Sequence, residues 1–282
     1  MKTILLPTDF SDNSWNAIEY ALNFYKDSKC NFYLLHVIKL NNEVTEDYLY
    51  SSAQNVAVVD AKVHRAKKQL KEVLNKISEK FPNGSKKHNF YTLTDSNFFI
   101  ESIRNHIEEI KVDVIVMGTK GASGLSKFII GSNTGDVITQ VKCTTLVIPE
   151  NAKFNKIEEV AFPTDFSLSN GLQVLQSITE ILDKNKASLR VLNINKKSSK
   201  LNPQQQKSKE LLEDYFFNYT HSFHFVTNKK IEDGVQSFVK SRNIDMIAMV
   251  AKNLNYFQQI LFHNKVEEIS YHTDIPFLVL HE

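Results

Sequence analysis

The chain is poor in cysteine, with two among its 282 residues, and also in glycine, proline and tryptophan, with eight, six and one. Two cysteines cannot build the disulfide framework of a small secreted domain. Both of them, Cys30 and Cys143, lie in apolar, strand-like segments. We therefore expect two buried, reduced thiols and a cytoplasmic protein.

An excess of one charge and long apolar runs are missing too. The 34 basic and 32 acidic residues leave a net charge of +2, which gives no electrostatic reason to expect a nucleic-acid or membrane partner. No apolar run approaches the roughly 20 residues of a membrane-spanning helix. The stretch before Pro7 is too short for a secretory signal. What remains is an ordinary globular composition in a chain long enough for two domains.

The segment from Asp113 to Asp136 contains the clearest local pattern. It opens with a continuous apolar run, Val114–Met117, which is typical of a strand buried on both faces of a parallel sheet. Half of the chain's glycines follow, at Gly118, Gly121, Gly124 and Gly131. Three residues of helix-capping type then precede a new apolar periodicity. This order predicts a phosphate cradle, because glycine lets backbone N–H groups approach a ligand and a helix N-terminus attracts anions.

The spacing Gly118-x2-Gly121-x9-Gly131-Ser132 is neither a P-loop nor the G-x-G-x-x-G of a dinucleotide fold. Taken alone, these glycines could also occupy ordinary turns. The spacing is similar, however, to the nucleotide-binding signature of the universal stress protein family. The rest of the chain decides between the two interpretations.

Short apolar strands alternate with helical periodicity along the first half. Strands are predicted at Thr3–Leu6, Phe32–Ile38, Asn89–Leu93, Val114–Met117 and Thr145–Ile148. Helices are predicted after the first strand, over Asp60–Phe81, over Phe98–Ile110 and after Gly131. This alternation implies right-handed crossovers and a doubly wound, parallel sheet.

The pattern then starts again. The word P-T-D-F-S occurs at Pro7–Ser11 and at Pro163–Ser167, a shift of 156 (163 − 7). Asp113–Met117 is matched by Asp245–Met249, a shift of only 132 (245 − 113). The second copy is therefore shorter in between, and we place most of the loss in its long helix, reduced to about Pro203–Tyr219. An internal duplication is the strongest organisational signal in the chain.

Both copies resemble universal stress protein domains, so the resemblance covers nearly the whole chain as a tandem pair. It implies an α/β fold of two tandem, five-stranded, parallel-sheet domains, Rossmann-like and of the HUP type. The first domain would span 1–149 and carry the nucleotide-binding motif, a linker would span 150–156, and a degenerate domain would span 157–282. Ligands of such sheets lie across the carboxyl ends of the strands.

The resemblance also implies a binding site for ATP, with or without Mg. The alternative ligands are ADP, AMP or a cyclic nucleotide. Asp9 would accept hydrogen bonds from the ribose or adenine, and Val37 would line the adenine pocket. Gly118 and Gly121 would let the chain pass close to the ribose and phosphates. Backbone N–H and hydroxyl groups would bind phosphate oxygens at Gly131, Ser132, Asn133 and Thr134. Weaker, wall-forming candidates are Pro7, Thr8 and Met117. Asn133 departs from the small apolar residue expected there.

The second copy lacks this glycine set. At the shift of 132, the counterparts of Gly118, Gly121, Gly131 and Ser132 are Val250, Asn253, His263 and Asn264. A β-branched valine resists positive φ and fills space that a phosphate would need. Large apolar residues that would plug this cleft or face the other domain are Tyr256, Phe257, Leu261 and Phe262.

No set of residues predicts catalysis or a metal site. His221 and His224 are three apart on a strand-like run and so point to opposite faces, with no cysteine or carboxylate at ligand spacing. His36 is better explained as a hydrogen-bonded strand histidine than as a base. No Ser/His/Asp order or nucleophile elbow is present.

The sequence thus predicts a cytoplasmic stress-response protein that binds an adenine nucleotide in its first domain, as a nucleotide-dependent regulator or binding module and not as an enzyme. Slow ATP hydrolysis is compatible with this prediction. Two alternatives stay open: a tandem scaffold with vestigial glycines, and an adenylyl-transferring enzyme of the same superfamily. The protein partner stays unidentified, and the tandem chain could dimerise further.

The final strands of the two copies, Thr145–Ile148 and Phe277–Leu280, would each be an exposed apolar sheet edge. Natural proteins cover such edges because they promote aggregation. We expect the two strands to cover each other within one chain, as an intrachain pseudo-dimer.

Overall fold

The computed structural model describes residues 1–38, 53–82, 87–119, 131–167, 172–195, 200–251 and 274–281. In the first half the elements are β1 (Lys2–Pro7), α1 (Asp12–Phe24), β2 (Cys30–Val37), α2 (Ala53–Lys80), β3 (Asn89–Asp95), α4 (Phe99–Ile110), β4 (Val114–Gly118), α5 (Ser132–Gln140) and β5 (Thr145–Ile148). In the second half they are β6 (Glu159–Pro163), η2 (Leu172–Leu175), α6 (Gln176–Asn185), β7 (Ser188–Asn195), α7 (Pro203–Tyr215), β8 (His221–Thr227), α8 (Ile231–Ser241), β9 (Met246–Val250) and β10 (Phe277–Leu280).

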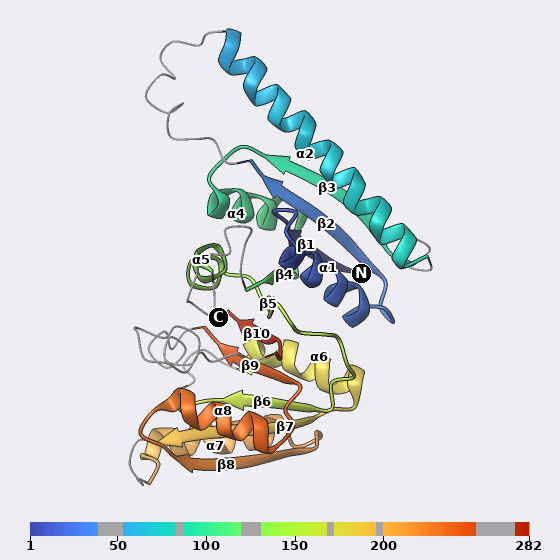
Figure 1. The fold of residues 1–282 in the computed structure, drawn as a ribbon. Helices are drawn as coiled ribbons and strands as arrows, with labels where there is room; N and C mark the ends of the chain where they lie inside the picture. The colour runs from blue at the N-terminus through green and yellow to red at the C-terminus, as the bar shows by residue number, and fades with distance from the viewer. Residues whose placement is uncertain are drawn as a thin grey trace.

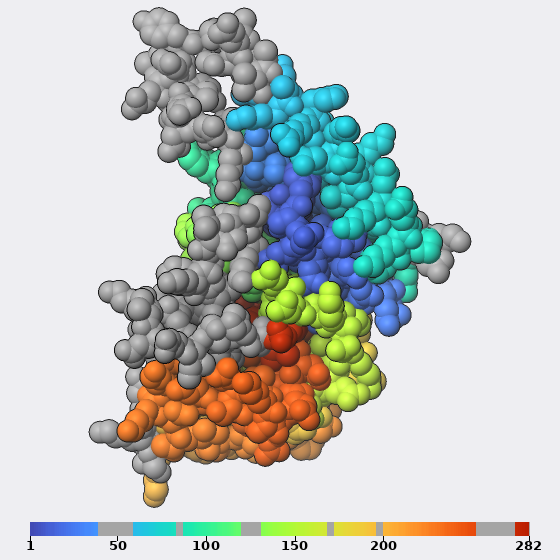
Figure 2. Space-filling model, in the orientation of Figure 1, coloured from blue at the N-terminus to red at the C-terminus, as the bar shows by residue number. Residues whose placement is uncertain are grey.

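The ten strands of the described residues belong to one sheet, in the order β3-β2-β1-β4-β5-β10-β9-β6-β7-β8 (Figure 1). Strands β5 and β10 pair antiparallel, with Leu278 opposite Leu146, and the other strand pairs are parallel. The strand order within one half therefore repeats in the other, which confirms the predicted α/β class and the pairing of the two final strands. In Figure 2 the C-terminal strand is visible between the two halves.

The hydrophobic core crosses between the two halves on both faces of the sheet, and most extensively on one of them. There, one cluster contains residues of α1, α2, α6 and α7, and both joining strands contribute to it through Leu146 and Leu278. The opposite face carries two separate clusters, one under α4 and α5 and one under α8. Val147 and Ile138 belong to the cluster under α8, so the first half also completes the core of the second.

Polar contacts add to this apolar junction. Asn16 on α1 donates from Nδ2 to the carbonyl oxygens of Pro149 and Ala152, both at 3.1 Å, where the chain leaves the first half. Lys184 on α6 donates to the carbonyl oxygen of Phe24, and its Nζ lies 5.0 Å from the centre of that ring. Helices of the two halves are thus held together on the same side of the sheet.

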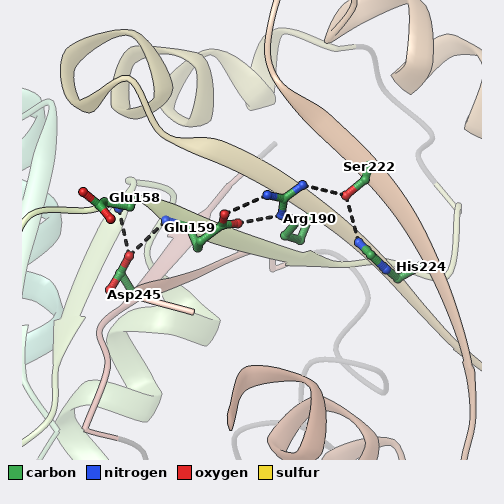
Figure 3. A network of polar contacts seen from close by, with 6 residues as sticks. All are labelled: Glu158, Glu159, Arg190, Ser222, His224 and Asp245. Carbon is green, nitrogen blue, oxygen red and sulfur yellow. Dashed lines mark hydrogen bonds and ion pairs between the residues drawn. The ribbon is translucent and has the colours of Figure 1, made fainter. Parts of the chain in front are cut away.

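The aspartates that begin the repeated D-x-x-x-M word have the same structural role in both halves. Asp113 Oδ2 accepts a hydrogen bond from Thr3 N at 2.7 Å, joining the start of β4 to β1. Asp245 Oδ2 accepts from Glu158 N at 2.8 Å and from Glu159 N at 2.9 Å, joining the start of β9 to β6 (Figure 3). The carboxylate therefore sets the register of two parallel strands that are far apart in sequence.

A chain of polar side chains continues from this point across the second half (Figure 3). Arg190 binds Glu159 with two hydrogen bonds, of 2.6 and 2.7 Å, and donates to Ser222 Oγ at 2.9 Å. Ser222 Oγ lies 2.8 Å from His224 Nε2. Burial, together with Arg242 and Arg190, lowers the pKa of His224. The network connects β6, β7 and β8.

The ends of several helices differ from their prediction. Helix α2 begins at Ala53 instead of Asp60, and α7 ends at Tyr215 instead of Tyr219. Helix α5 takes Gly131 as its N-cap residue, whereas the sequence suggested the three polar residues after it. Both cysteines are buried free thiols, as predicted. Within the described ranges, no helix has both the length and the apolar character that crossing a bilayer requires.

Candidate functional site

The word P-T-D-F-S forms a tight turn where β1 ends. Asp9 Oδ1 accepts hydrogen bonds from Ser11 N at 3.1 Å and from Ser11 Oγ at 2.6 Å, while Thr8 Oγ1 accepts from Phe10 N at 3.1 Å. These bonds hold Phe10 at a φ of 65°, a left-handed conformation that a non-glycine residue rarely adopts. Ser11 then caps α1 by accepting from Ser14 N at 3.2 Å. The turn leaves Asp9 exposed at the carboxyl edge of the sheet.

His36, near the end of β2, supports this turn from the neighbouring strand. Its Nδ1 lies 2.8 Å from the carbonyl oxygen of Thr8, so Nδ1 carries a proton and donates it. Its ring lies 4.4 Å from the ring of Phe10, centre to centre. The prediction of a hydrogen-bonded strand histidine is confirmed. Val37, the next residue, ends β2 at the same sheet edge.

Strand β4 ends at Gly118 beside β1, and a side chain at this position would meet that of Asn13. A Cβ there would lie 2.8 Å from Asn13 Nδ2 and 2.9 Å from Asn13 Cγ. The Gly118 carbonyl oxygen accepts a hydrogen bond from Thr134 Oγ1 at 2.8 Å, and Gly131 N donates to the carbonyl oxygen of Thr119. The start of α5 is therefore fastened to the end of β4.

Helix α5 presents its N-terminus at this edge. Its N-cap, Gly131, has no side chain to cap the helix, and the first helical bond is donated by Gly135 N to Gly131 O at 2.9 Å. Ser132 and Asn133 are exposed. The amides of the first turn precede that bond and have no partner within the helix, which makes the end of α5 suited to an anion.

The fold brings most of the predicted site residues to one edge of the sheet. Described there are Pro7, Thr8, Asp9, Val37, Met117, Gly118, Gly131, Ser132, Asn133 and Thr134. Gly121 and Gly124 lie outside the described residues. One assigned role needs correction: the Thr134 hydroxyl is buried and donates to Gly118 O, so it is not available to donate to phosphate. The role assigned to Gly118 stays a prediction, and the structure adds a second reason for glycine there, the close approach of the Asn13 side chain.

The second half rebuilds the same turn without the same surroundings. Asp165 Oδ1 accepts from Ser167 N and Oγ at 3.0 and 2.6 Å, matching the first turn. Asn193 replaces His36 and donates to Thr164 O at 2.9 Å. Gln205 of α7 donates to the Asp165 carbonyl oxygen at 3.0 Å. The aligned residues after β9, with His263 and Asn264, lie outside the described residues, as do the four large apolar residues predicted to plug this cleft.

Comparison with known proteins identifies the family. A model of the universal stress protein family matches residues 1–149, which is more than half of the chain. This chain belongs to the universal stress protein family. Universal stress protein MJ0577 of Methanocaldococcus jannaschii is 31% identical over 157 residues, covering 52% of this chain and 94% of that protein. Universal stress protein MJ0531 of the same organism is 30% identical over 152 residues, covering 54% of this chain and 84% of that protein.

A solved structure shows the fold over the full length. The crystal structure of a universal stress protein from Archaeoglobus fulgidus superposes with a TM-score of 0.70, covering 98% of this chain and 97% of its own, at 18% identity. The overall fold of nearly the whole chain is therefore shared with that universal stress protein.

Three polar side chains of this universal stress protein were missed by sequence reasoning. Asn13 fills the space at Gly118, Asn193 substitutes for His36, and Gln205 binds the second turn. Aligning the two copies could have revealed Asn193, because it occupies the position of His36 in the repeated strand. No local sequence pattern indicates the roles of Asn13 and Gln205, because each role depends on a contact between distant segments. Among the described residues, no group of three or more His, Cys, Asp or Glu could hold a metal ion.

Proposed function

We propose that this protein binds one adenine nucleotide per chain, ATP first of all, at the carboxyl edge of its first half, and acts as a cytoplasmic, nucleotide-dependent regulator or binding module in the stress response. The observation that carries the proposal is the end of α5, whose N-cap is a glycine without a side-chain cap and whose first residues are exposed beside the Asp9 turn. Family membership supports a role in stress.

In this proposal the phosphates lie at the N-terminus of α5. Backbone N–H groups at Ser132 and Asn133 would bind phosphate oxygens, and the helix dipole would add a favourable charge interaction. Asp9, held by Ser11, would accept hydrogen bonds from hydroxyl or amino groups of the nucleoside. Thr134 contributes indirectly, by fixing the helix to Gly118 O.

The proposal assigns binding and not catalysis. Phosphoryl transfer needs a residue that orients the nucleophile and cations that stabilise the transferred group. The described residues at this edge supply an exposed carboxylate, backbone amides and small polar side chains. These groups hold a nucleotide, with Mg bound through its phosphates, without activating a water molecule.

The duplicated turn provides a matched test. Asp9→Asn and Asp165→Asn remove the same carboxylate from turns with the same hydrogen bonds, so their local folding costs should be similar. Calorimetry with Mg-ATP should give one site per chain. Asp9→Asn should weaken it about tenfold, the size of one hydrogen bond to a charged group, whereas Asp165→Asn should leave it unchanged.

A second variant tests the phosphate end. Gly131→Val places a β-branched side chain at the N-cap beside the exposed amides, so a folded variant should show no ATP binding at millimolar concentration. The sequence-matched change His263→Val, in the second copy, should not alter affinity. Two equivalent sites, no binding by the parent protein, or equal loss from Asp9→Asn and Asp165→Asn would each contradict the proposal.

A further inference from the structure

A pocket of about 540 Å³ lies at the carboxyl ends of β7 and β8. These two strands lie in the second half, at the other end of the sheet from the strands of the proposed nucleotide site (Figure 1). Asn195 and Thr227, the last residues of these strands, are register partners and line it side by side. Residues from α7 and from the segment before it line it as well, including Lys209 and Lys200. Its volume falls in the usual range for small-molecule sites.

One wall of the pocket is an exposed aromatic ring. Phe225 is 51% exposed, although Phe223, two residues before it on the same face of the sheet, packs against the core. The ring centre lies 6.1 Å from that of the buried Phe166, which supports it from one side. Phe225 therefore offers a fixed apolar surface on which a planar group can stack.

The charge of the pocket is positive. Lys209 Nζ is held 4.6 Å from the ring centre of Phe223 and 2.9 Å from Glu213, so its position is set and its charge is partly balanced. Lys200 is exposed, and within the described part of the chain no hydrogen bond or ion pair engages it. No carboxylate is among the described residues that line the pocket. An anionic group is the natural counterpart of Lys200.

We propose that this pocket binds a small aromatic anion, with the ring on Phe225 and a phosphate or carboxylate group at Lys200. Asn195 and Thr227 then provide polar contacts at the strand ends. None of the described lining residues belongs to the turn Pro163–Ser167, although Phe166 of that turn supports Phe225. The proposal does not depend on nucleotide binding in the first half.

The experiment is a titration of the full-length protein followed by backbone amide NMR shifts, with phenyl phosphate, benzoate and inorganic phosphate as probes. Phenyl phosphate or benzoate should shift the amides of Asn195 and Thr227 in a saturable manner, and the tighter of the two identifies the anion. Either should bind more tightly than inorganic phosphate. Shifts confined to the first half, or an equal Kd for inorganic phosphate, would overturn the proposal.

Variants separate binding from folding. Lys200→Gln should weaken the tighter probe at least about threefold, as expected for one exposed charge pair. Phe225→Leu, which keeps an apolar side chain but removes the ring, should weaken it by at least about fivefold, the low end of stacking on an aromatic side chain. Lys207→Gln, on an exposed position of α7 outside the pocket, is the control for charge and should leave the Kd unchanged. Equal effects of Lys200→Gln and Lys207→Gln would refute the site.

Discussion

Gly118→Ala tests whether the most prominent glycine of the sequence is required by packing. The new Cβ would lie 2.8 to 2.9 Å from three atoms of the Asn13 side chain, which is only 8% exposed and has little space into which to move. Overpacking of this kind costs about 1–3 kcal/mol. Alanine recovers about 0.5–1 kcal/mol over glycine within a strand. We therefore expect the free energy of unfolding to fall by about 1–2 kcal/mol.

We expect Gly118→Ala and Asn13→Ala to be coupled in their effects on the free energy of unfolding. Asn13→Ala removes the three atoms that a Cβ at 118 would meet, so Gly118→Ala should cost little when Asn13 is already alanine. The double-mutant cycle should give a coupling of about 1–2 kcal/mol. Urea unfolding followed by the fluorescence of Trp15 is a suitable assay, because the single tryptophan lies on α1, two residues after Asn13.

Two outcomes would refute this account of Gly118. The first is a Gly118→Ala variant as stable as the parent, and the second is a loss that is the same with and without Asn13. The same proteins also separate packing from ligand binding. If Gly118 additionally makes room for a nucleotide, the double variant will regain stability without regaining affinity for ATP.

Three further predictions concern the junction and its buried groups. Val147 and Val279 are fully buried where β5 and β10 meet, so the double variant Val147→Asp and Val279→Asp should expose the strand edges and aggregate or unfold. A double variant that is compact by size exclusion and as heat-stable as the parent would contradict the role of the β5–β10 pairing. Burial, and to a lesser degree Lys142, lowers the pKa of His281 to about 4 in the folded protein. In the unfolded chain this pKa is about 6.5, so between pH 6.5 and 4 the imidazole is protonated in the unfolded chain but neutral in the folded protein. The free energy of unfolding should consequently fall by up to about 3 kcal/mol between pH 6.5 and 4, and His281→Gln should reduce this slope; an unchanged slope would show that other groups cause it. Burial also raises the pKa of the Cys143 thiol to about 12, so it should not react with a disulfide reagent at mildly alkaline pH until the protein is unfolded, and rapid labelling of the folded protein would contradict its burial.

The repeated words of the sequence determined the fold class and its duplication. P-T-D-F-S folds into the same turn in both halves, with the same hydrogen bonds and a phenylalanine near a φ of 60° each time. These contacts involve residues at most a few positions apart, so identical letters give identical structure. The same holds for the apolar runs that became β4 and β9, since burial on both faces requires continuous apolar sequence.

Only the tertiary structure decided what lies around those local elements. Asn13 and Gly118 are separated by the rest of the first half, and their contact exists because α1 packs across the end of β4. Likewise, the single ten-stranded sheet requires β10 to return beside β5 after the whole second half has folded. Contacts of this kind depend on how distant surfaces meet and leave no periodic trace in the sequence. For that reason the sequence could indicate a nucleotide-binding edge, while the tie between Thr134 and Gly118 appeared only in the folded protein.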